Sequence, residues 1–252
     1  MTCLFAFEQT YPNVSNMIFS VPWGHHKYIM DKFRTEQEVA LFYVRKTVEN
    51  GWSRAVLLNF IDSGLHLRQG KAITNFEMKL PDPESDLAQQ TTKDPYTFDF
   101  IALTEQYHER ELKEALLANI QKFLLELGNG FAFVGKEYRF QIGEEEKFAD
   151  LVFYHIRLNC FVVVEVKTEK FEAAHLGQLG LYVSAANHQL RRSTDAPTIG
   201  LLICKSKDDV VAKWALESSS EPLGISEYQL TNLLPADLKS DLPTIAEIEA
   251  VT

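Results

Sequence analysis

The sequence is poor in cysteine and has no long apolar run, and each absence excludes a class of protein. Its cysteines, Cys3, Cys160 and Cys204, are odd in number, far apart and without a Cys-x-x-Cys pair. We therefore expect reduced thiols, and neither a disulfide framework nor a zinc site. The chain has no stretch of roughly eighteen apolar residues and no basic region leading into an apolar one at its start. It is expected to be soluble and cytoplasmic, with no membrane partner.

An excess of positive charge is also lacking, since the formal net charge is −10. Residues 217–252 hold 1 Lys or Arg against 7 Asp or Glu, so the end of the chain supplies most of this acidity and the rest is close to neutral. A DNA partner is compatible with this distribution, although no global basic field promotes it. The 252 residues, of which 46% are hydrophobic and 24% charged, suit one large globular domain or two small ones.

Apolar residues in the first part of the chain recur at helical spacing. Residues 27–50 predict one helix, which Asn50-Gly51 ends, and Ser53 predicts the cap of a second helix. Three prolines then stand among polar residues, a composition typical of a linker. We expect a small helical, helix-turn-helix-like domain over 1–80 and a linker over 81–98.

The remaining sequence predicts an α/β fold of the mixed α+β kind, in which a mixed sheet is flanked by helices over 99–218. The expected elements are a long helix within 99–128, strands at 131–142, 148–155 and 159–167, a helix at 172–190, a strand at 198–204 and a helix at 208–216. Residues 219–252 are expected to form an acidic C-terminal extension with one short strand at 225–230.

Acidic residues occur within two of the predicted strands. Residues 161–167 read Phe-Val-Val-Val-Glu-Val-Lys, so alternation places Glu165 and Lys167 on one face. Asp150 begins the apolar run of the preceding strand, and a hairpin can bring it beside Glu165. Two carboxylates about 4 Å apart repel by roughly 4 kcal/mol at an effective dielectric constant near 20. A bridging dication would remove that penalty, and oxygen ligands favour Mg²⁺ or Mn²⁺.

Such a site can hydrolyse a phosphodiester. The ion would lower the pKa of a water and stabilise the leaving oxygen, while Lys167 could orient the water or neutralise charge in the transition state. A solvated strand end that reads Glu-Val-Lys would show the same pattern, so the residues alone leave both interpretations open.

Two predicted helices can complete the site. Glu109 falls on the apolar face of the helix at 99–128 and is a candidate metal ligand, although a frayed first turn explains it equally well. On the helix at 172–190, Gln178 and Tyr182 lie one turn apart and could reach a phosphate, but helix-surface residues have the same spacing. His155 follows a buried strand and is expected to satisfy a turn rather than to act as a base.

Short motifs that resemble one family extend over nearly the whole chain, from about Pro12. The N-terminal ones are Val21-Pro-Trp-Gly-His25, Gly51-Trp-Ser-Arg54 and Lys93-Asp-Pro-Tyr-Thr-Phe-Asp99. The C-terminal ones are Phe123-Leu-Leu-Glu-Leu-Gly128, Gly130-Phe-Ala-Phe-Val-Gly135, Asp150-Leu-Val-Phe-Tyr-His155, Val164-Glu-Val-Lys167, Gly177-Gln178 and Pro197-Thr-Ile-Gly200. Together they resemble the YhcG-like bacterial family, whose C-terminal half is a PD-(D/E)XK nuclease module related in fold to restriction endonucleases.

The resemblance implies site residues and an activity. The acidic pair of the nuclease motif falls on Asp150 and Glu165, its lysine on Lys167, and the helical Glu and auxiliary Gln on Glu109 and Gln178. The family implies a Mg²⁺-dependent DNA endonuclease, discussed with mobile-element and defence functions. Nucleases of this fold often act as dimers, so a homodimer is a further implication.

The chain departs from the family pattern at two places. Where members commonly carry a second Glu after the position of Glu109, this chain has Lys113, which leaves Glu109 as the better ligand candidate. Members also have a longer segment before the Trp-Gly-His motif, so the N-terminal domain is expected to be shortened at its start.

Two functions therefore stand as hypotheses. In the first, Glu109, Asp150 and Glu165 hold Mg²⁺, Lys167 positions the attacking water and Gln178 helps to orient the phosphate. In the second, the nuclease fold is a DNA- or protein-binding module with weak or vestigial catalysis. The basic residues considered for DNA contacts are Arg45, Lys46, Arg54, Arg68 and Lys71 in the first domain, and Lys136, Arg139, Arg191, Arg192, Lys205 and Lys207 in the second.

Overall fold

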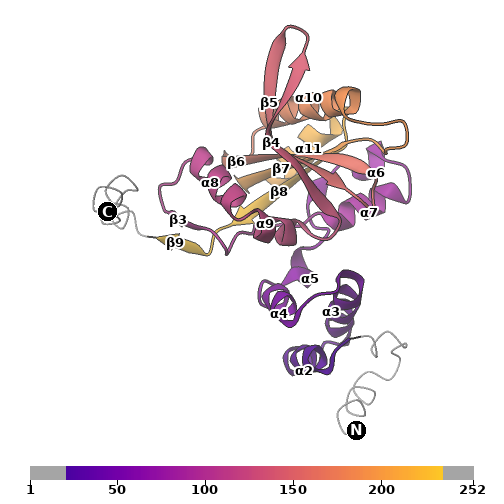
Figure 1. Cartoon of the computed structure of the whole chain (residues 1–252), viewed down its shortest axis with the longest axis vertical. Coiled ribbons are helices and arrows are strands. Elements are labelled where there is room, and N and C mark those ends of the chain that lie inside the picture. Colours follow the sequence, from indigo (N-terminus) through magenta and orange to yellow (C-terminus); the bar gives the residue numbers. More distant parts are fainter. Residues whose placement is uncertain (1–20, 235–252) are drawn as a thin grey trace, which may run out of the picture. The chain divides into compact units, whose positions relative to one another are not determined.

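The computed structural model describes residues 21–234 and divides the chain into two compact units, Met1–Arg68 and Gln69–Thr252, which are described separately here (Figure 1). Cys3 and the acidic stretch 235–252 lie outside the described residues. None of the helices within 21–234 combines the length and the apolar character that crossing a membrane requires.

The first unit is helical throughout its described part. Its helices are α2 (Trp23–Lys32), α3 (Gln37–Asn50), α4 (Arg54–Asp62) and α5 (Leu65–Arg68). Tyr43 and Leu57 are fully buried in the core that these helices share. Gly51 ends α3 in left-handed backbone (φ 61°), and the Ser53 hydroxyl accepts the Val56 N–H (3.4 Å) at the start of α4.

The single helix predicted over 27–50 is wrong, because two helices occupy this range. Helix α2 ends at Phe33, whose backbone leaves the helical region (φ −120°, ψ 38°). The Phe33 ring is buried and stacks on Tyr43, with a centroid separation of 5.2 Å. Packing between the two helices therefore outweighs the continuous periodicity of the sequence.

The second unit is built on a mixed sheet, which confirms the predicted fold class. Its strands are β4 (Phe131–Ile142), β5 (Glu145–His155), β6 (Cys160–Lys170), β7 (Ile199–Ser206), β8 (Leu223–Gln229), β1 (Ile73–Thr74) and β2 (Tyr96–Thr97). The order is β1-β8-β7-β6-β5-β4, and β2 pairs with β8 off this path. Strands β4, β5 and β6 are antiparallel neighbours, whereas β6, β7 and β8 are parallel.

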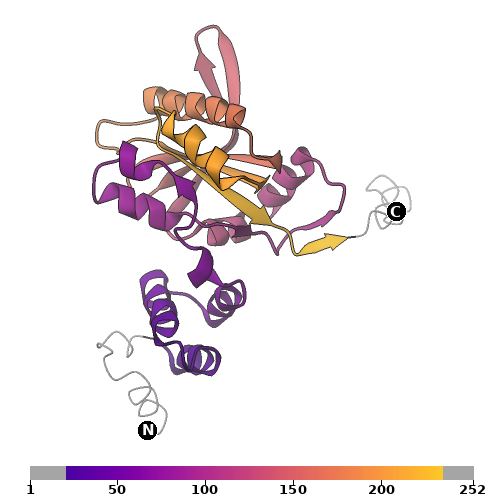
Figure 2. The same cartoon turned by 180° about the vertical axis from the view of Figure 1, so that it is seen from behind.

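Helices cover both faces of the sheet. Helices α8 (Glu109–Ala118) and α9 (Ile120–Leu127) pack on one face, and α10 (Ala173–Gln189) and α11 (Asp209–Glu217) pack on the other, where Figure 2 has them in front. The alternation of β6 serves both cores, since Val164 and Val166 enter the first and Val163 enters the second. This central strand also carries Glu165 and Lys167.

The linker predicted over 81–98 is instead part of the second unit. It contains α7 (Glu84–Thr91), which packs on α6 (Phe76–Lys79), followed by β2. Ala88, Tyr96 and Phe98 are fully buried. The unit boundary lies between Arg68 and Gln69, because the apolar residues among the prolines belong to the core of the sheet.

The single long helix predicted within 99–128 is wrong, because two shorter helices occupy this range. Residues 99–108 include β3 (Ala102–Thr104), which pairs in parallel with β9 (Asn232–Leu234). Helix α8 then begins at Glu109, and Asn119 separates it from α9. The Asn119 side-chain amide donates to the Ala115 carbonyl (3.0 Å), so a side chain satisfies a carbonyl at the end of α8.

The predicted C-terminal extension also needs correction, because its first part belongs to the sheet. Strand β8 lies between β7 and β1 in the sheet. It is longer than the short strand predicted at 225–230 and starts two residues earlier. Ile225 and Ser226 are buried within it. Residues 223–229 therefore complete the main sheet, and residues 232–234 pair with β3.

Candidate active site

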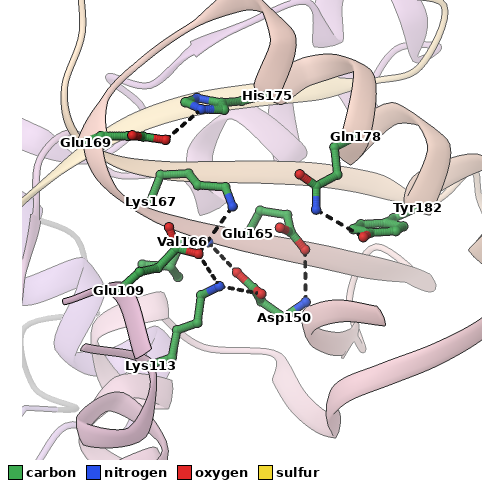
Figure 3. A network of polar contacts seen from close by, with 10 residues as sticks. All are labelled: Glu109, Lys113, Asp150, Glu165, Val166, Lys167, Glu169, His175, Gln178 and Tyr182. Atoms are coloured by element: carbon green, nitrogen blue, oxygen red, sulfur yellow. Dashed lines mark hydrogen bonds and ion pairs between the residues drawn. The ribbon is translucent and has the colours of Figure 1, made fainter. Parts of the chain in front are cut away.

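Strands β5 and β6 bring the two strand carboxylates together, as the sequence predicts. Their backbone pairing runs from His155↔Cys160 to Leu151↔Val164, and Asp150 and Glu165 follow in this register. At this point carboxylates, and not backbone carbonyls, accept the hydrogen bonds between the two strands. The Asp150 N–H donates to Glu165 Oε1 (2.9 Å), and the Val166 N–H donates to Asp150 Oδ2 (3.0 Å) (Figure 3). Each carboxylate is thus fixed by the neighbouring strand's backbone.

Glu165 is the most deeply buried acid of this group, at 2% exposure. Its Oε2 atom has no hydrogen-bond partner among the described residues. Burial, and secondarily the negative charge of Asp150, raise the pKa of the Glu165 carboxyl to about 8. A buried carboxylate oxygen without a donor is costly in its ionised form unless a cation meets it. This orphan oxygen therefore fits a divalent ion.

Helix α8 contributes both an acid and a base to the same cluster. Glu109 is its first residue, and Lys113 lies one turn later on the same side of the helix. The Lys113 ammonium contacts Glu109 Oε1 (2.5 Å) and Asp150 Oδ1 (2.7 Å), so it joins α8 to β5 (Figure 3). Burial alone would lower the pKa of Lys113, but the Asp150 and Glu109 carboxylates outweigh it and raise that pKa.

Lys167 approaches the cluster from β6. Its ammonium stands 3.3 Å from Glu109 Oε1, and its side chain is only 14% exposed. Burial by itself would raise the pKa of Glu109, but Lys113 and then Lys167 outweigh this effect and lower it. Glu109, Asp150, Glu165 and Lys167 thus lie together, as predicted, while Lys113 was treated in the sequence only as a departure from a family pattern. The four-residue spacing from Glu109 was the signal that could have placed it.

The chemistry of the cluster fits a divalent cation, although its side chains are not arranged to coordinate one in this conformation. Asp150 and Glu165 lie on adjacent strands, Lys113 links Glu109 to Asp150, and carboxylate oxygen donors of this kind suit Mg²⁺ or Mn²⁺. However, no three acidic, histidine or cysteine side chains in the range 21–234 are close enough together to hold an ion as they stand. Lys113 and Lys167 lie against Glu109, so this third carboxylate faces ammonium groups rather than an open position.

Gln178 and Tyr182 extend from α10 beside the charged cluster (Figure 3). The Gln178 amide donates to the Tyr182 hydroxyl (3.0 Å), and Tyr182 is buried while Gln178 is exposed. The predicted one-turn relationship is therefore a direct hydrogen bond. This bond fixes the orientation of the Gln178 amide and leaves its oxygen for another partner.

Other residues singled out from the sequence have structural partners. His155 is buried and accepts the Leu158 N–H at Nδ1 (3.1 Å), as a turn-satisfying role predicts. Burial lowers the pKa of His155 to about 4. Cys160 and Cys204 are buried in strands, where burial raises the pKa of each thiol to about 12.

Several of the basic residues considered for DNA contacts are engaged elsewhere. Arg68 is buried, at 4% exposure, and donates to the Ser63 carbonyl (3.1 Å). The Lys207 side chain is 7% exposed and paired with Asp94. Arg139 is exposed but pairs with a glutamate on the neighbouring strand. The DNA-contacting role considered for Arg68 and Lys207 is therefore contradicted, because both side chains are buried and engaged with protein partners.

Comparison with known proteins places this geometry in a family. The family model of the YhcG PDDEXK nuclease domain matches residues 89–243, and that of the DUF1016 N-terminal domain matches residues 1–68. An Escherichia coli (strain K12) protein named "Putative nuclease YhcG" is 32% identical over 194 residues, which are 75% of this chain and 51% of that protein. The chain thus spans about half the length of this curated relative.

Two solved structures are partly similar. A repair endonuclease from Pyrococcus abyssi has 23% identity and a TM-score of 0.34, covering 52% of this chain and 50% of the other. A complex of EndoMS with dsDNA has 21% identity and a TM-score of 0.36, covering 54% and 48%. The nuclease-domain model by itself matches more than half of the chain and includes the whole charged cluster. The chain belongs to the YhcG family of PDDEXK nuclease-domain proteins.

Proposed function

We propose that this chain is a nuclease that hydrolyses phosphodiester bonds in DNA with the help of Mg²⁺ or Mn²⁺. The observation that carries the proposal is the junction of β5 and β6, where the Asp150 N–H donates to the Glu165 carboxylate and the Val166 N–H donates to the Asp150 carboxylate. There Glu165 Oε2 is buried without a donor among the described residues. Lys167 lies two residues further along β6, on the same face as Glu165. Membership of a nuclease-domain family supports the reaction class.

The three carboxylates divide into two groups in this proposal. Asp150 and Glu165 would be the principal ligands, because they lie on adjacent strands and Glu165 Oε2 has no donor among the described residues, and Glu109 would be the third ligand from α8. When bound, the ion lowers the pKa of a water and stabilises negative charge on the phosphate and the leaving oxygen.

The chain's own residues supply the positioning. The Lys167 ammonium donates hydrogen bonds to the attacking water or to the phosphate, whose negative charge grows in the transition state. The Gln178 amide, held by Tyr182, orients the phosphate from α10. The water oxygen loses a proton to solvent and bonds to phosphorus as the bond to the leaving oxygen breaks, and the leaving oxygen takes up a proton from solvent. No covalent enzyme intermediate forms. A single site cuts one strand, so a double-strand break would require two chains, as in a homodimer.

The test combines DNA cleavage with metal binding. Wild type is incubated with linear, circular and branched DNA and Mg²⁺ or Mn²⁺, beside Asp150→Asn, Lys167→Met and the control Glu145→Gln, which neutralises an exposed carboxylate on the same strand. We expect wild type and the control to cleave and the other two variants to lose at least about a hundredfold in rate. The melting temperature of each protein is also measured with and without Mn²⁺. Adding Mn²⁺ should raise the melting temperature of wild type and Lys167→Met but not that of Asp150→Asn.

Two outcomes would contradict the proposal. If Mn²⁺ raises the melting temperature of neither wild type nor Asp150→Asn, and no DNA is cut, the alternative holds: a nuclease fold that binds DNA or protein without catalysis. If Lys167→Met cleaves at the wild-type rate, the lysine has no part in the mechanism. A supposed role in mobile elements or defence rests on the family resemblance and follows only if DNA is the substrate.

A further inference from the structure

Lys113 occupies a position that the proposed mechanism does not use. Its ammonium bridges two carboxylates from different elements, Glu109 on α8 and Asp150 on β5, at 2.5 and 2.7 Å. The Lys113 side chain is 23% exposed, so this bridge is partly screened from solvent. A cation is therefore already built into the carboxylate cluster.

The hydrogen bonds show which oxygens remain for a metal ion. Asp150 Oδ2 accepts the Val166 N–H, and Glu165 Oε1 accepts the Asp150 N–H. The two oxygens that no backbone donor claims are Glu165 Oε2 and Asp150 Oδ1. Glu165 Oε2 lacks a hydrogen-bond partner among the described residues, and Asp150 Oδ1 accepts a hydrogen bond from the Lys113 ammonium. An ion shared by Asp150 and Glu165 would meet Lys113 at Asp150 Oδ1.

The formal charges lead to the same conclusion. With Glu165 ionised, as binding of a cation requires, Glu109, Asp150 and Glu165 carry three negative charges, and Lys113 and Lys167 carry two positive ones. One dication would turn the net charge of the cluster from −1 to +1. Without Lys113 the cluster would carry −2, which one dication would neutralise. Lys113 therefore opposes the ion.

We propose that Lys113 is an internal cation that competes with the divalent ion for Asp150 Oδ1 and Glu109 Oε1, and so weakens metal binding in wild type. This proposal rests on the proposed function, because it concerns the same site. The ion binds when the Lys113 side chain moves away from Asp150. The opposite role is a positioning one, in which Lys113 holds Asp150 in place for the metal. The two roles predict opposite signs when the ammonium is removed.

The experiment measures Mn²⁺ binding to the full chain by isothermal titration calorimetry. Lys113→Gln removes the charge, Lys113→Arg keeps it, and Lys122→Gln removes an exposed charge from the neighbouring helix α9 as a matched control. A tenfold change in affinity corresponds to about 1.4 kcal/mol, which is the order of the two ion pairs that Lys113 must give up before the ion binds. We expect Lys113→Gln to bind Mn²⁺ at least about tenfold more tightly than wild type, and the other two variants to remain close to it.

The outcomes separate this proposal from the proposed function. If wild type binds Mn²⁺ and Lys113→Gln binds it equally or more weakly, the competition is refuted while the metal site stands. If only Lys113→Gln binds, the competition is supported and metal-dependent catalysis by wild type is not. If neither binds, both proposals fail. Thermal unfolding in EDTA establishes that each variant is folded before the titration.

Discussion

Replacing Glu165 with Gln should abolish a pH dependence of folding stability that the buried carboxyl creates. Glu165 is 2% exposed, and its neighbour Asp150 adds negative charge, so the folded state favours the protonated form. The folded-state pKa is about 8, against 4.5 for an ordinary glutamate. The stabilising contribution of this group is therefore complete below about pH 4.5 and is lost as the pH rises towards 8.

The size of the effect follows from this difference in pKa. A carboxyl that titrates near pH 8 when folded and near 4.5 when unfolded loses at most about 5 kcal/mol of stabilisation across that interval. Water entry and side-chain rearrangement reduce such penalties, as the high effective dielectric constant of protein sites indicates. We therefore expect metal-free wild type to lose about 2–4 kcal/mol, relative to Glu165→Gln, between about pH 5 and about pH 9.

Urea unfolding in EDTA at both pH values gives the required free energies. Other groups titrate in both proteins, so the difference between wild type and variant isolates Glu165. Glu105→Gln, which neutralises an exposed carboxyl ahead of α8, should retain the wild-type dependence. If wild type and Glu165→Gln lose stability in parallel, the carboxyl is not held in its protonated form, and the reasoning from burial is wrong.

Two further predictions concern the supporting structure. Gly200→Ala should lower the free energy of unfolding in urea by about 1–3 kcal/mol, because a Cβ there would lie 2.6 Å from Leu223 Cδ2 and 2.8 Å from Val183 Cγ2. An unchanged midpoint of the urea transition would mean that the core accommodates the methyl group. The pKa of His155 is about 4 in the folded protein, against 6.5 for an ordinary histidine. As the pH falls, the imidazole therefore binds a proton in the unfolded chain before it does so in the folded one. The free energy of unfolding should consequently fall by up to about 3 kcal/mol between pH 6.5 and pH 4. His155→Asn, whose side-chain oxygen can still accept the Leu158 N–H, should reduce this acid loss, and an equal loss in both proteins would exclude His155 as its source.

The β5–β6 hairpin could be predicted because its signals are local. Apolar runs placed strands at 148–155 and 159–167, close to the observed β5 and β6, and the short distance in sequence between Asp150 and Glu165 left an antiparallel pairing as the simplest way to join them. For Glu109 the sequence left two interpretations open, a metal ligand on the apolar face of the helix and an acid in its first turn, and Glu109 is the first residue of α8. Glu109 itself therefore stands at the positive end of α8.

Other features depended on contacts between residues far apart in sequence. The buried Phe33 ring ends α2 against Tyr43, and Tyr96 and Phe98 join the core from a segment whose prolines and polar residues are typical of linkers. Strand β8 became an interior strand because β7 and β1 pair with its two edges. Periodicity within a short window carries no information about such partners.

By itself, the amino-acid sequence determined the mixed fold, the pairing of Asp150 with Glu165 and the side of β6 on which Lys167 lies, because strand alternation and hairpin formation are properties of neighbouring residues. Only the tertiary structure decided where the Lys113 ammonium lies. Its contact with Asp150 joins α8 to β5, across thirty-seven positions of the chain, and depends on how the helix packs against the sheet. The balance between carboxylates and ammonium groups, on which metal binding depends, is therefore a property of the packed structure.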